Sequence, residues 1–352
     1  MNYKKSANSN DGLILMMSLW ILALVSLLSI GLAHRVLVHI KLTRYQKDNI
    51  KLLCLAKAAI QQARAVLEND SNQGADTLNE LWSCGIDFSS AADESIFKDQ
   101  RLKEGSFSAS YIFDEEDQEE PKIFYGLVDE ERKININIAS SEKLAALFSI
   151  LLPELSNPKT LADAIIYWRG ANPEGYEASY YEDKGYSARR DKFKTIDELG
   201  LVEGFREEPE LIEKCKKFIT VFTQDDNINV NTASAQVLEA VFLSQGAKDG
   251  LEKKLADFII DTRDGDDNQE GTGDDVLIES GQVKVKFLEI SGLTPEQTAW
   301  INSQGFPFTD KSNLFTIDVT ARLEYSTTQK RVNAVFKRGQ DNKTEIIFWH
   351  EE

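Results

Sequence analysis

The sequence predicts an α+β fold, in which a long N-terminal helix packs on an antiparallel sheet and a large all-α domain of two repeats is inserted into the sheet domain. Three observations support this prediction. An apolar segment continues without interruption into an amphipathic one between residues 13 and 67. Strand-like stretches occur both before and after a central helical block. The phrase Ile-Asn-x-Asn-x-Ala-Ser occurs at residues 134–140 and again at 228–234.

The N-terminal segment predicts a single membrane-spanning helix. Residues 1–12 are polar, whereas residues 13–32 carry no charge, and a run of about 20 apolar residues matches the thickness of a bilayer. From Leu32 to Leu67 apolar side chains recur at steps of three and four residues, and no Pro or further Gly interrupts them. We therefore expect one helix over residues 13–67, with its first half in lipid and its second half against the soluble domain.

Strands are expected on both sides of the helical block, where apolar and polar residues alternate between polar turns. The expected strands cover residues 105–113, 122–135, 313–325, 330–339 and 344–352. Residues 68–135 would then be the first part of an α/β domain, and residues 305–352 its C-terminal strands. The inserted helical domain would cover residues 136–304.

The inserted domain is predicted to consist of two repeats, at about residues 134–226 and 227–304. "LADAIIYWRG" at 161–170 aligns with "LADFIIDTRDG" at 255–265. Each repeat therefore contains an Asn phrase, a helical hairpin that ends near Arg and Gly, an acidic loop and a further short helix.

The Asn phrase is interpreted as a helix cap. Side chains of this type accept hydrogen bonds from the exposed backbone N–H groups at the start of a helix. Asn231 or Thr232 is expected to cap the first helix of the second repeat. Asn137, Ser140 and Glu142 are expected to do the same in the first repeat.

The same phrase also precedes the first helix of helix-hairpin-helix DNA-binding modules. Such a module needs a Gly-x-Gly turn whose N–H groups approach a phosphate, and neither residues 151–160 nor residues 244–254 contain one. The formal net charge of −18 also repels phosphate backbones. No nucleic acid is therefore expected as a partner, and a membrane-anchored helix-hairpin-helix DNA-binding protein is a less favoured alternative.

The distribution of polar residues does not suggest an enzyme. The sequence has no Ser/His/Asp set, no Gly-rich phosphate loop after a strand and no cysteine paired with a histidine. The three cysteines form no C-x-x-C motif, which argues against a zinc site. A disulfide between Cys84 and Cys215 is left open, because it requires a soluble part outside the cytoplasm.

The acidic loop of the second repeat is the candidate metal site. Six carboxylates lie within twelve residues that also include three glycines, and packing them together without a cation is unfavourable. Oxygen ligands on a flexible loop suit calcium, so we expect a structural calcium ion there; the alternative is a solvated acidic loop. The candidate ligands are Asp264, Asp266, Asp267, Glu270, Asp274 and Asp275. The first repeat offers fewer candidates, namely Asn172, Glu174 and Glu177.

Several features together resemble the K-type minor pseudopilin of the type II (general) secretion pathway. Gly12 precedes the apolar helix, and Met17 stands at the fifth position after it, where most pilins have Glu. The stretches "DEERKININIAS" and "FKTIDEL" and a C-terminal meander with "VNAVFKR" and "IIFW" follow in the order of that family. The resemblance implies a pilin-like sheet domain, and a leader peptide at residues 1–12.

The resemblance also implies processing and location. A prepilin peptidase would cut between Gly12 and Leu13, and Leu13 would then be N-methylated. The mature chain would be a single-pass protein of the inner membrane with its soluble domain in the periplasm. Its partners would be the I- and J-type minor pseudopilins, the major pseudopilin and the inner-membrane secretion platform.

The function implied by the resemblance is structural. The subunit would sit at the tip of the pseudopilus, initiate its assembly and support the export of folded proteins across the outer membrane. The missing Glu fits this position, because in pilins that side chain is thought to neutralise the N-terminal amine of a preceding subunit, and a first subunit has none ahead of it. A minor type IV pilin-like assembly or adhesion protein is the alternative.

Overall fold

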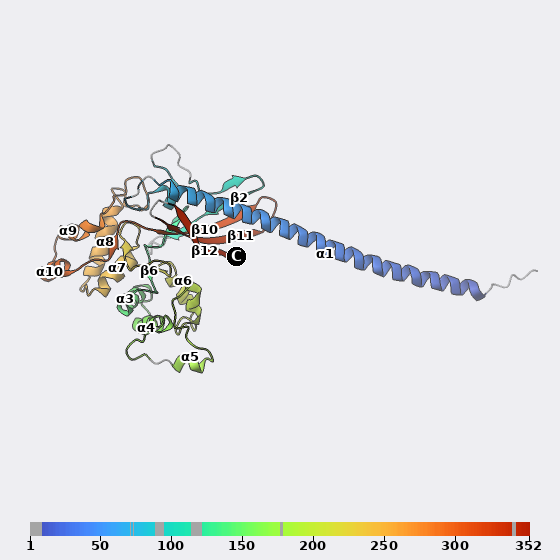
Figure 1. Cartoon of the computed structure of the whole chain (residues 1–352), viewed down its shortest axis with the longest axis horizontal. Helices are drawn as coiled ribbons and strands as arrows, with labels where there is room; N and C mark the ends of the chain where they lie inside the picture. Colours follow the sequence, from blue (N-terminus) through green and yellow to red (C-terminus); the bar gives the residue numbers. More distant parts are fainter. Residues whose placement is uncertain are drawn as a thin grey trace, which may run out of the picture.

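A single long helix, α1 (Ser9–Glu68), projects from a head that contains all the other elements (Figure 1). The structure is a computed structural model that describes residues 9–70, 72, 74–88, 95–113, 122–176, 179–339 and 343–352. With 60 residues, α1 is about 90 Å long. Among the described residues, its stretch Gly12–Glu68 is the one helix long and apolar enough to cross a membrane.

The two halves of α1 have different environments, as the sequence predicted. From Leu13 to Leu42 the large apolar side chains are exposed, and this half makes no contact with the head. The second half lies across the sheet, and its buried side chains follow steps of three and four residues. They are Leu52, Leu55, Ala56, Ala59, Ile60, Ala63 and Leu67. The alanines in this stripe allow the helix to approach the strands closely.

The sheet under α1 is antiparallel and has the strand order β1-β2-β10-β11-β12, with β5 also paired to β10. Its strands are β1 (Gln100–Leu102), β2 (Gly105–Ala109), β5 (Val128–Asp129), β10 (Leu314–Leu323), β11 (Gln329–Arg338) and β12 (Thr344–Glu351). Every second residue of β10 from Phe315 to Leu323 is buried in the core that includes α1. The short helix α2 (Leu81–Cys84) adds Trp82, whose ring meets the Phe315 ring edge-on at 4.9 Å.

Two predicted strands are divided in the structure. The segment 105–113 leaves β2 at Ser110 and continues as β3 (Tyr111–Phe113), which pairs with β4 (Lys122–Phe124) and not with β10. The segment 122–135 contributes to β4, β5 and β6 in turn, each with a different partner. Alternation identified the extended segments correctly, but pairing partners divide them.

The helices between β6 and β9 form one block with a shared core. The first repeat contains α3 (Ser141–Leu151), α4 (Pro158–Trp168), α5 (Ser179–Asp183), η1 (Ile196–Leu201) and α6 (Glu210–Cys215). The second contains α7 (Ala235–Ser244), α8 (Leu251–Arg263), η2 (Ser280–Gln282), α9 (Val283–Phe287) and α10 (Pro295–Ser303). Helix α3 packs on both α4 and α7, and α7 packs on α8, so the two hairpins lie against each other.

Each repeat begins and ends in a short parallel strand pair. Strand β6 (Ile134–Asn135) pairs with β7 (Ile219–Thr220), and β8 (Ile228–Asn229) pairs with β9 (Phe308–Thr309). These pairs bring the two ends of each repeat together. The predicted fold class, a long helix on an antiparallel sheet with many additional helices, is confirmed.

Candidate functional site

The two Asn phrases make the same contacts in the two repeats. The Asn137 side chain donates to the Phe193 carbonyl at 2.9 Å and accepts from the Phe193 N–H at 2.7 Å. The Asn231 side chain donates to the Ile278 carbonyl at 3.0 Å and accepts from its N–H at 2.8 Å. Each amide thus binds a distant backbone segment in the manner of a neighbouring strand, and both partners lie shortly before a helix that follows the acidic loop.

The prediction that the phrase caps its helix is wrong for the asparagines. The N-cap residues are Ser140, whose side chain accepts a backbone hydrogen bond, and Ser234, whose side chain makes no cap bond. Asn137 and Asn231 lie three residues earlier, in a turn, and their side chains are already used across the repeat. Thr232 donates instead to a buried carboxylate of the sheet domain. Ser140 acts as predicted, and Glu142 also acts at this end of α3, because hydrogen bonds from its own backbone N–H and from the Ser140 side chain lower the pKa of its carboxyl.

An arginine at the end of each hairpin binds back to the phrase. Arg169 donates to the carbonyls of Ile136 and Ala139, at 2.7 and 2.8 Å. Arg263 donates to the Ala233 carbonyl at 2.5 Å and lies 3.5 Å from that of Val230. The alignment of the two repeats within the sequence includes both arginines, but it predicted no role for them. They connect the end of the second helix to the turn that begins the first.

Arg263 also holds two of the six predicted calcium ligands. Its guanidinium lies 3.2 Å from an Asp264 oxygen and forms a short ion pair with Glu270, and all three side chains are buried. Burial raises the pKa of Asp264 to about 7, although the Arg263 charge opposes this rise. These two carboxylates therefore have a protein cation as their partner.

Three of the other four carboxylates, those of Asp267, Asp274 and Asp275, accept from N–H groups of the loop. One Asp274 oxygen accepts from the N–H groups of Asp266 and Asp267, at 2.9 and 3.1 Å. Asp275 accepts from two further loop N–H groups, at 2.8 and 3.0 Å. The residues Asp266 and Asp267 are themselves largely exposed. Two of the six predicted ligands thus bind an arginine, and three bind the backbone of the loop.

The loop of the first repeat contains an internal cation. Arg190, which has a positive φ of 57°, donates to three carbonyls within residues 167–171 and to the Asn172 side chain at 2.7 Å. Asn172 is therefore occupied by a guanidinium in this structure. Glu174 lies in the following turn, and Glu177 lies outside the described residues.

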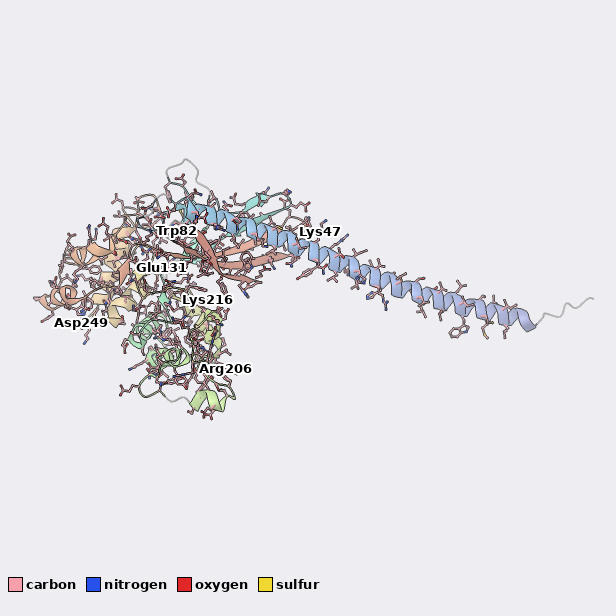
Figure 2. The ribbon with its side chains drawn as sticks, in the orientation of Figure 1. Lys47, Trp82, Glu131, Arg206, Lys216 and Asp249 are labelled. Carbon is pink, nitrogen blue, oxygen red and sulfur yellow. The ribbon has the colours of Figure 1, made fainter. Side chains whose placement is uncertain are left out.

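A buried polar network connects the second phrase to the sheet domain. One Asp129 oxygen accepts from Thr232 at 2.6 Å, from Ser312 at 2.7 Å and from Asn229 at 3.1 Å. Glu131, which lies where the sheet meets the helical block (Figure 2), accepts from two N–H groups at the start of β10. Burial raises the pKa of both carboxyls, and that of Glu131 also rises because of the Asp129 charge.

Comparison with known proteins agrees with this architecture. Residues 126–224, which include the first Asn phrase and the first hairpin, match the family model of the type II secretion system protein K. One chain of the crystal structure of the GspK-GspI-GspJ complex from the type 2 secretion system of enterotoxigenic Escherichia coli has a similar fold, with a TM-score of 0.60 and 17% identity. The match covers 88% of this chain and 99% of that chain.

The resemblance to the K-type minor pseudopilins is thereby confirmed. No curated protein sequence matches the chain. Protein K is a component of the type II secretion system. The family model covers the first repeat, and the similar fold extends over most of the chain.

The three cysteines are free thiols in this structure. Cys54 is exposed on α1, whereas Cys84 and Cys215 are buried in different apolar clusters. Burial raises the pKa of Cys84 to about 11 and that of Cys215 to about 12. The sequence left a disulfide between Cys84 and Cys215 open. In this structure the two residues are separate thiols.

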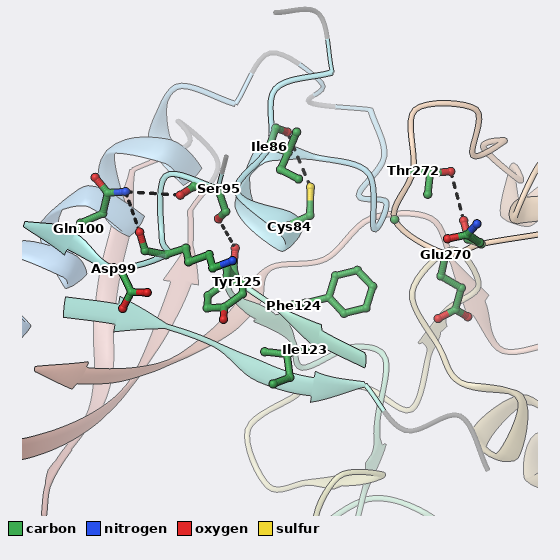
Figure 3. A pocket seen from close by; sticks show the side chains of 13 residues that line it. Cys84, Ile86, Ser95, Asp99, Gln100, Ile123, Phe124, Tyr125, Glu270 and Thr272 are labelled. Carbon is green, nitrogen blue, oxygen red and sulfur yellow. Dashed lines mark hydrogen bonds between the residues drawn. The ribbon is translucent and has the colours of Figure 1, made fainter. Parts of the chain in front are cut away.

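A cavity of about 490 Å³ lies between β4 and the acidic loop (Figure 3). Phe124, Tyr125 and Cys84 line one side, and residues 269–272 line the other. A Cβ added to Gly271 would lie 2.5 Å from the Phe124 ring, so the loop and β4 approach each other closely at this glycine. Through this contact the acidic loop of the second repeat packs on the sheet domain.

Proposed function

We propose that this protein is the subunit at the tip of the type II secretion pseudopilus, where it initiates assembly together with the I- and J-type minor pseudopilins. The observation that carries the proposal is the position of the helical block. The block lies at the end of the head opposite to the exposed, apolar half of α1 (Figure 1). If that half is anchored in the inner membrane, the block is the part of the head farthest from it.

Three physical arguments support the proposal. The exposed apolar half of α1 offers a surface on which other subunit helices can pack in a fibre. The helical block adds a large volume beyond the sheet, which would obstruct a further subunit stacked above it. Met17 is uncharged, so it offers no carboxylate to the N-terminal amine of a subunit ahead of it.

The proposal places the chain across the inner membrane once, with the head in the periplasm. Its further partners would be the major pseudopilin and the inner-membrane secretion platform. Deletion of the gene from its native host should abolish export of folded substrates across the outer membrane, and the intact gene should restore it. Normal secretion by the deletion strain would overturn the proposed role.

We further propose that a prepilin peptidase cuts between Gly12 and Leu13 and that Leu13 is N-methylated. Mass spectrometry of the subunit purified from native membranes should find a peptide that begins with N-methylated Leu13. A chain that still carries Met1 to Gly12 would contradict this processing. The alternative of a minor type IV pilin-like protein shares the processing, so this test does not separate the two functions.

We also propose a structural calcium ion at the acidic loop. Since Arg263 already compensates Asp264 and Glu270, the remaining ligands would be Asp266, Asp267, Asp274 and Asp275. Calcium would compensate their charge and hold the loop in its folded form. Differential scanning calorimetry of the full chain in detergent should give a higher Tm in calcium than in EDTA. Asparagine at positions 266 and 267 should reduce this difference, and an unchanged difference would exclude these ligands.

A further inference from the structure

Helix α1 carries a basic segment where it leaves the apolar span of residues 13–32. Arg35, Lys41 and Arg44 follow that span, and residues 12–47 contain no acidic residue. All three basic side chains are exposed, and none of them forms an ion pair with another described residue. Their charges are therefore not compensated within the part of the chain that the structure describes.

The positive sign of this segment contrasts with the rest of the chain. The formal net charge is −18, and all but one of the 58 acidic residues lie in residues 48–352. The exposed positive charge on α1 is thus concentrated beside the segment that is long and apolar enough to cross a membrane. An acidic head is joined to an apolar span through a short basic stretch.

The basic side chains are directed to different sides of α1. Arg35 and Arg44 are nine residues apart in the sequence, which places them about 180° apart around the helix axis. Lys41 lies about 120° from Arg35 and about 60° from Arg44. A protein partner that packs along α1 covers one side of the helix, whereas a membrane surface surrounds it. This distribution therefore favours a lipid surface over an acidic partner helix.

The depth of the three charges also fits the surface of a bilayer. Arg35 lies about 4.5 Å beyond Leu32 along the axis, and Lys41 lies about 13.5 Å beyond it. The headgroups add about 5–8 Å on each side of the hydrocarbon. Because Cα–Cβ bonds tilt toward the N-terminus of a helix, the long side chains of Lys41 and Arg44 lean back toward the bilayer. Arg35 thus lies at headgroup depth, and the other two charges act on that layer within about one Debye length, which is about 8 Å.

The basic segment is connected to the head without a break in the helix. Residue 44 is followed within two turns by contacts that fix α1 to the sheet domain. The Tyr325 hydroxyl donates to Asp48 at 2.9 Å, and Lys51 donates to Tyr325 at 3.0 Å and forms an ion pair with Glu104. The depth of the basic segment in a membrane surface would therefore set the distance between the head and the bilayer.

We propose that Arg35, Lys41 and Arg44 form a basic collar on α1 that binds the phosphate groups of anionic phospholipids in the leaflet on the head's side of the membrane. The inference rests on the membrane span of the proposed function and not on the tip position. Each Lys or Arg near an anionic surface strengthens association with it by about fivefold. The same surface repels the acidic head, so the collar fixes the depth of α1 while the head stands away from the bilayer.

Quenching of Trp20 by brominated lipids tests the collar with the full chain. Trp20 is exposed in the apolar span, whereas the other four tryptophans belong to the head. The chain is reconstituted into phosphatidylcholine vesicles in which the same fraction of lipid is replaced by brominated phosphatidylglycerol or by brominated phosphatidylcholine. Phosphatidylglycerol should associate with the span about fivefold more strongly at low salt, and this ratio should fall toward one at high salt.

Charge variants separate the collar from the net charge of the chain. The combined variant Arg35→Gln with Lys41→Gln should reduce the preference to less than about twofold, whereas Arg35→Lys with Lys41→Arg should retain it. The combined variant Lys248→Gln with Lys253→Gln is the matched control, because it removes the same charge from exposed positions of the second repeat and should leave the preference unchanged. Trp20→Phe should abolish the quenching that depends on brominated lipid.

The outcomes distinguish the collar from the membrane span. Equal and strong quenching by the two lipids would overturn the collar and leave the span intact, and an acidic partner helix would then be the better candidate for these charges. A preference that survives in the variant with glutamine at positions 35 and 41 would also overturn the assignment. Absence of quenching by either lipid would contradict the span itself, and with it the proposed membrane location.

Discussion

Replacing Arg263 by Ala should destabilise the protein far more than replacing Arg169, although the two arginines occupy equivalent positions in the repeats. Both bind two carbonyls of the turn that contains the Asn phrase. Arg263 in addition binds Asp264 and Glu270, and all three side chains are at most 8% exposed. The two substitutions thus differ mainly in the buried charges that they leave behind.

The contacts of the two arginines give the expected losses in the free energy of unfolding. Loss of two hydrogen bonds to carbonyls, as in the half-buried Arg169, costs about 1–3 kcal/mol. Removing one member of a buried ion pair costs about 3–5 kcal/mol, because the remaining charge stays in a poorly solvated place. We therefore expect Arg263→Ala to lower the free energy of unfolding by about 2 kcal/mol more than Arg169→Ala. The total free energy of unfolding of a typical domain is about 5–15 kcal/mol, so a difference of this size is large.

Urea unfolding of the full chain in detergent, followed by tryptophan fluorescence, measures this difference. A combined variant that carries Arg263→Ala with Asp264→Asn and Glu270→Gln is the control, because neutral side chains no longer need the guanidinium charge. It should recover part of the loss. Equal losses for the two arginine variants, or no recovery in the combined variant, would refute the role assigned to the buried charges.

Three further predictions follow from single side chains. Asn231→Ala should lower the free energy of unfolding by about 2–4 kcal/mol in a urea titration, since it leaves a buried N–H and carbonyl without partners; a loss below about 1 kcal/mol would contradict the strand-like role of this amide. A thiol reagent at pH 8 should modify Cys54 rapidly. It should modify Cys84 and Cys215 only after denaturation, because burial raises their pKa to about 11 and about 12. Rapid reaction of more than one thiol in the folded chain, or reaction of fewer than three thiols in the denatured chain without reductant, would contradict this. The pKa of Glu131 is raised well above 4.5, so the folded chain holds a proton that the unfolded chain has released. Above about pH 4.5 stability should therefore fall as pH rises, by up to about 1.4 kcal/mol per pH unit until the raised pKa is passed. Glu131→Gln should flatten this part of the pH profile, and an unchanged slope would exclude Glu131 as its source.

Local pattern was sufficient for the elements with a long, regular period. The absence of charge from residue 13 to 32 and the three- and four-residue steps after it predicted α1 almost to its end. Alternation predicted β10, β11 and β12, because each of these strands places one face against a core. The two-residue strands β6 to β9 have too few residues to show any period, and they form only because the ends of each repeat meet.

The role of the Asn phrase could not be predicted, because it depends on contacts between distant parts of the chain. Asn137 and Asn231 look like caps when only the following helix is considered. Their partners lie 56 and 47 residues further along the chain. The duplication itself contained the information, since both phrases recur at the same offset from an arginine that binds them.

The acidic residues show what the composition of a sequence can and cannot predict about charged partners. Six carboxylates in the loop indicated a cation, and the structure places the Arg263 guanidinium against two of them. The group of Asp70, Asp76 and Glu80 is less conspicuous in the sequence. Its oxygens converge only because the chain turns back after α1 and is held there by Arg338 of β11.

The most direct test of the central claim is the assembly state of the purified full chain with its proposed partners. The full chain in detergent is mixed with the I- and J-type minor pseudopilins of the same secretion system, and size-exclusion chromatography with light scattering gives the mass of each species. The account predicts a stable ternary complex that contains one copy of each subunit. A chain that elutes alone in the presence of both partners would contradict it.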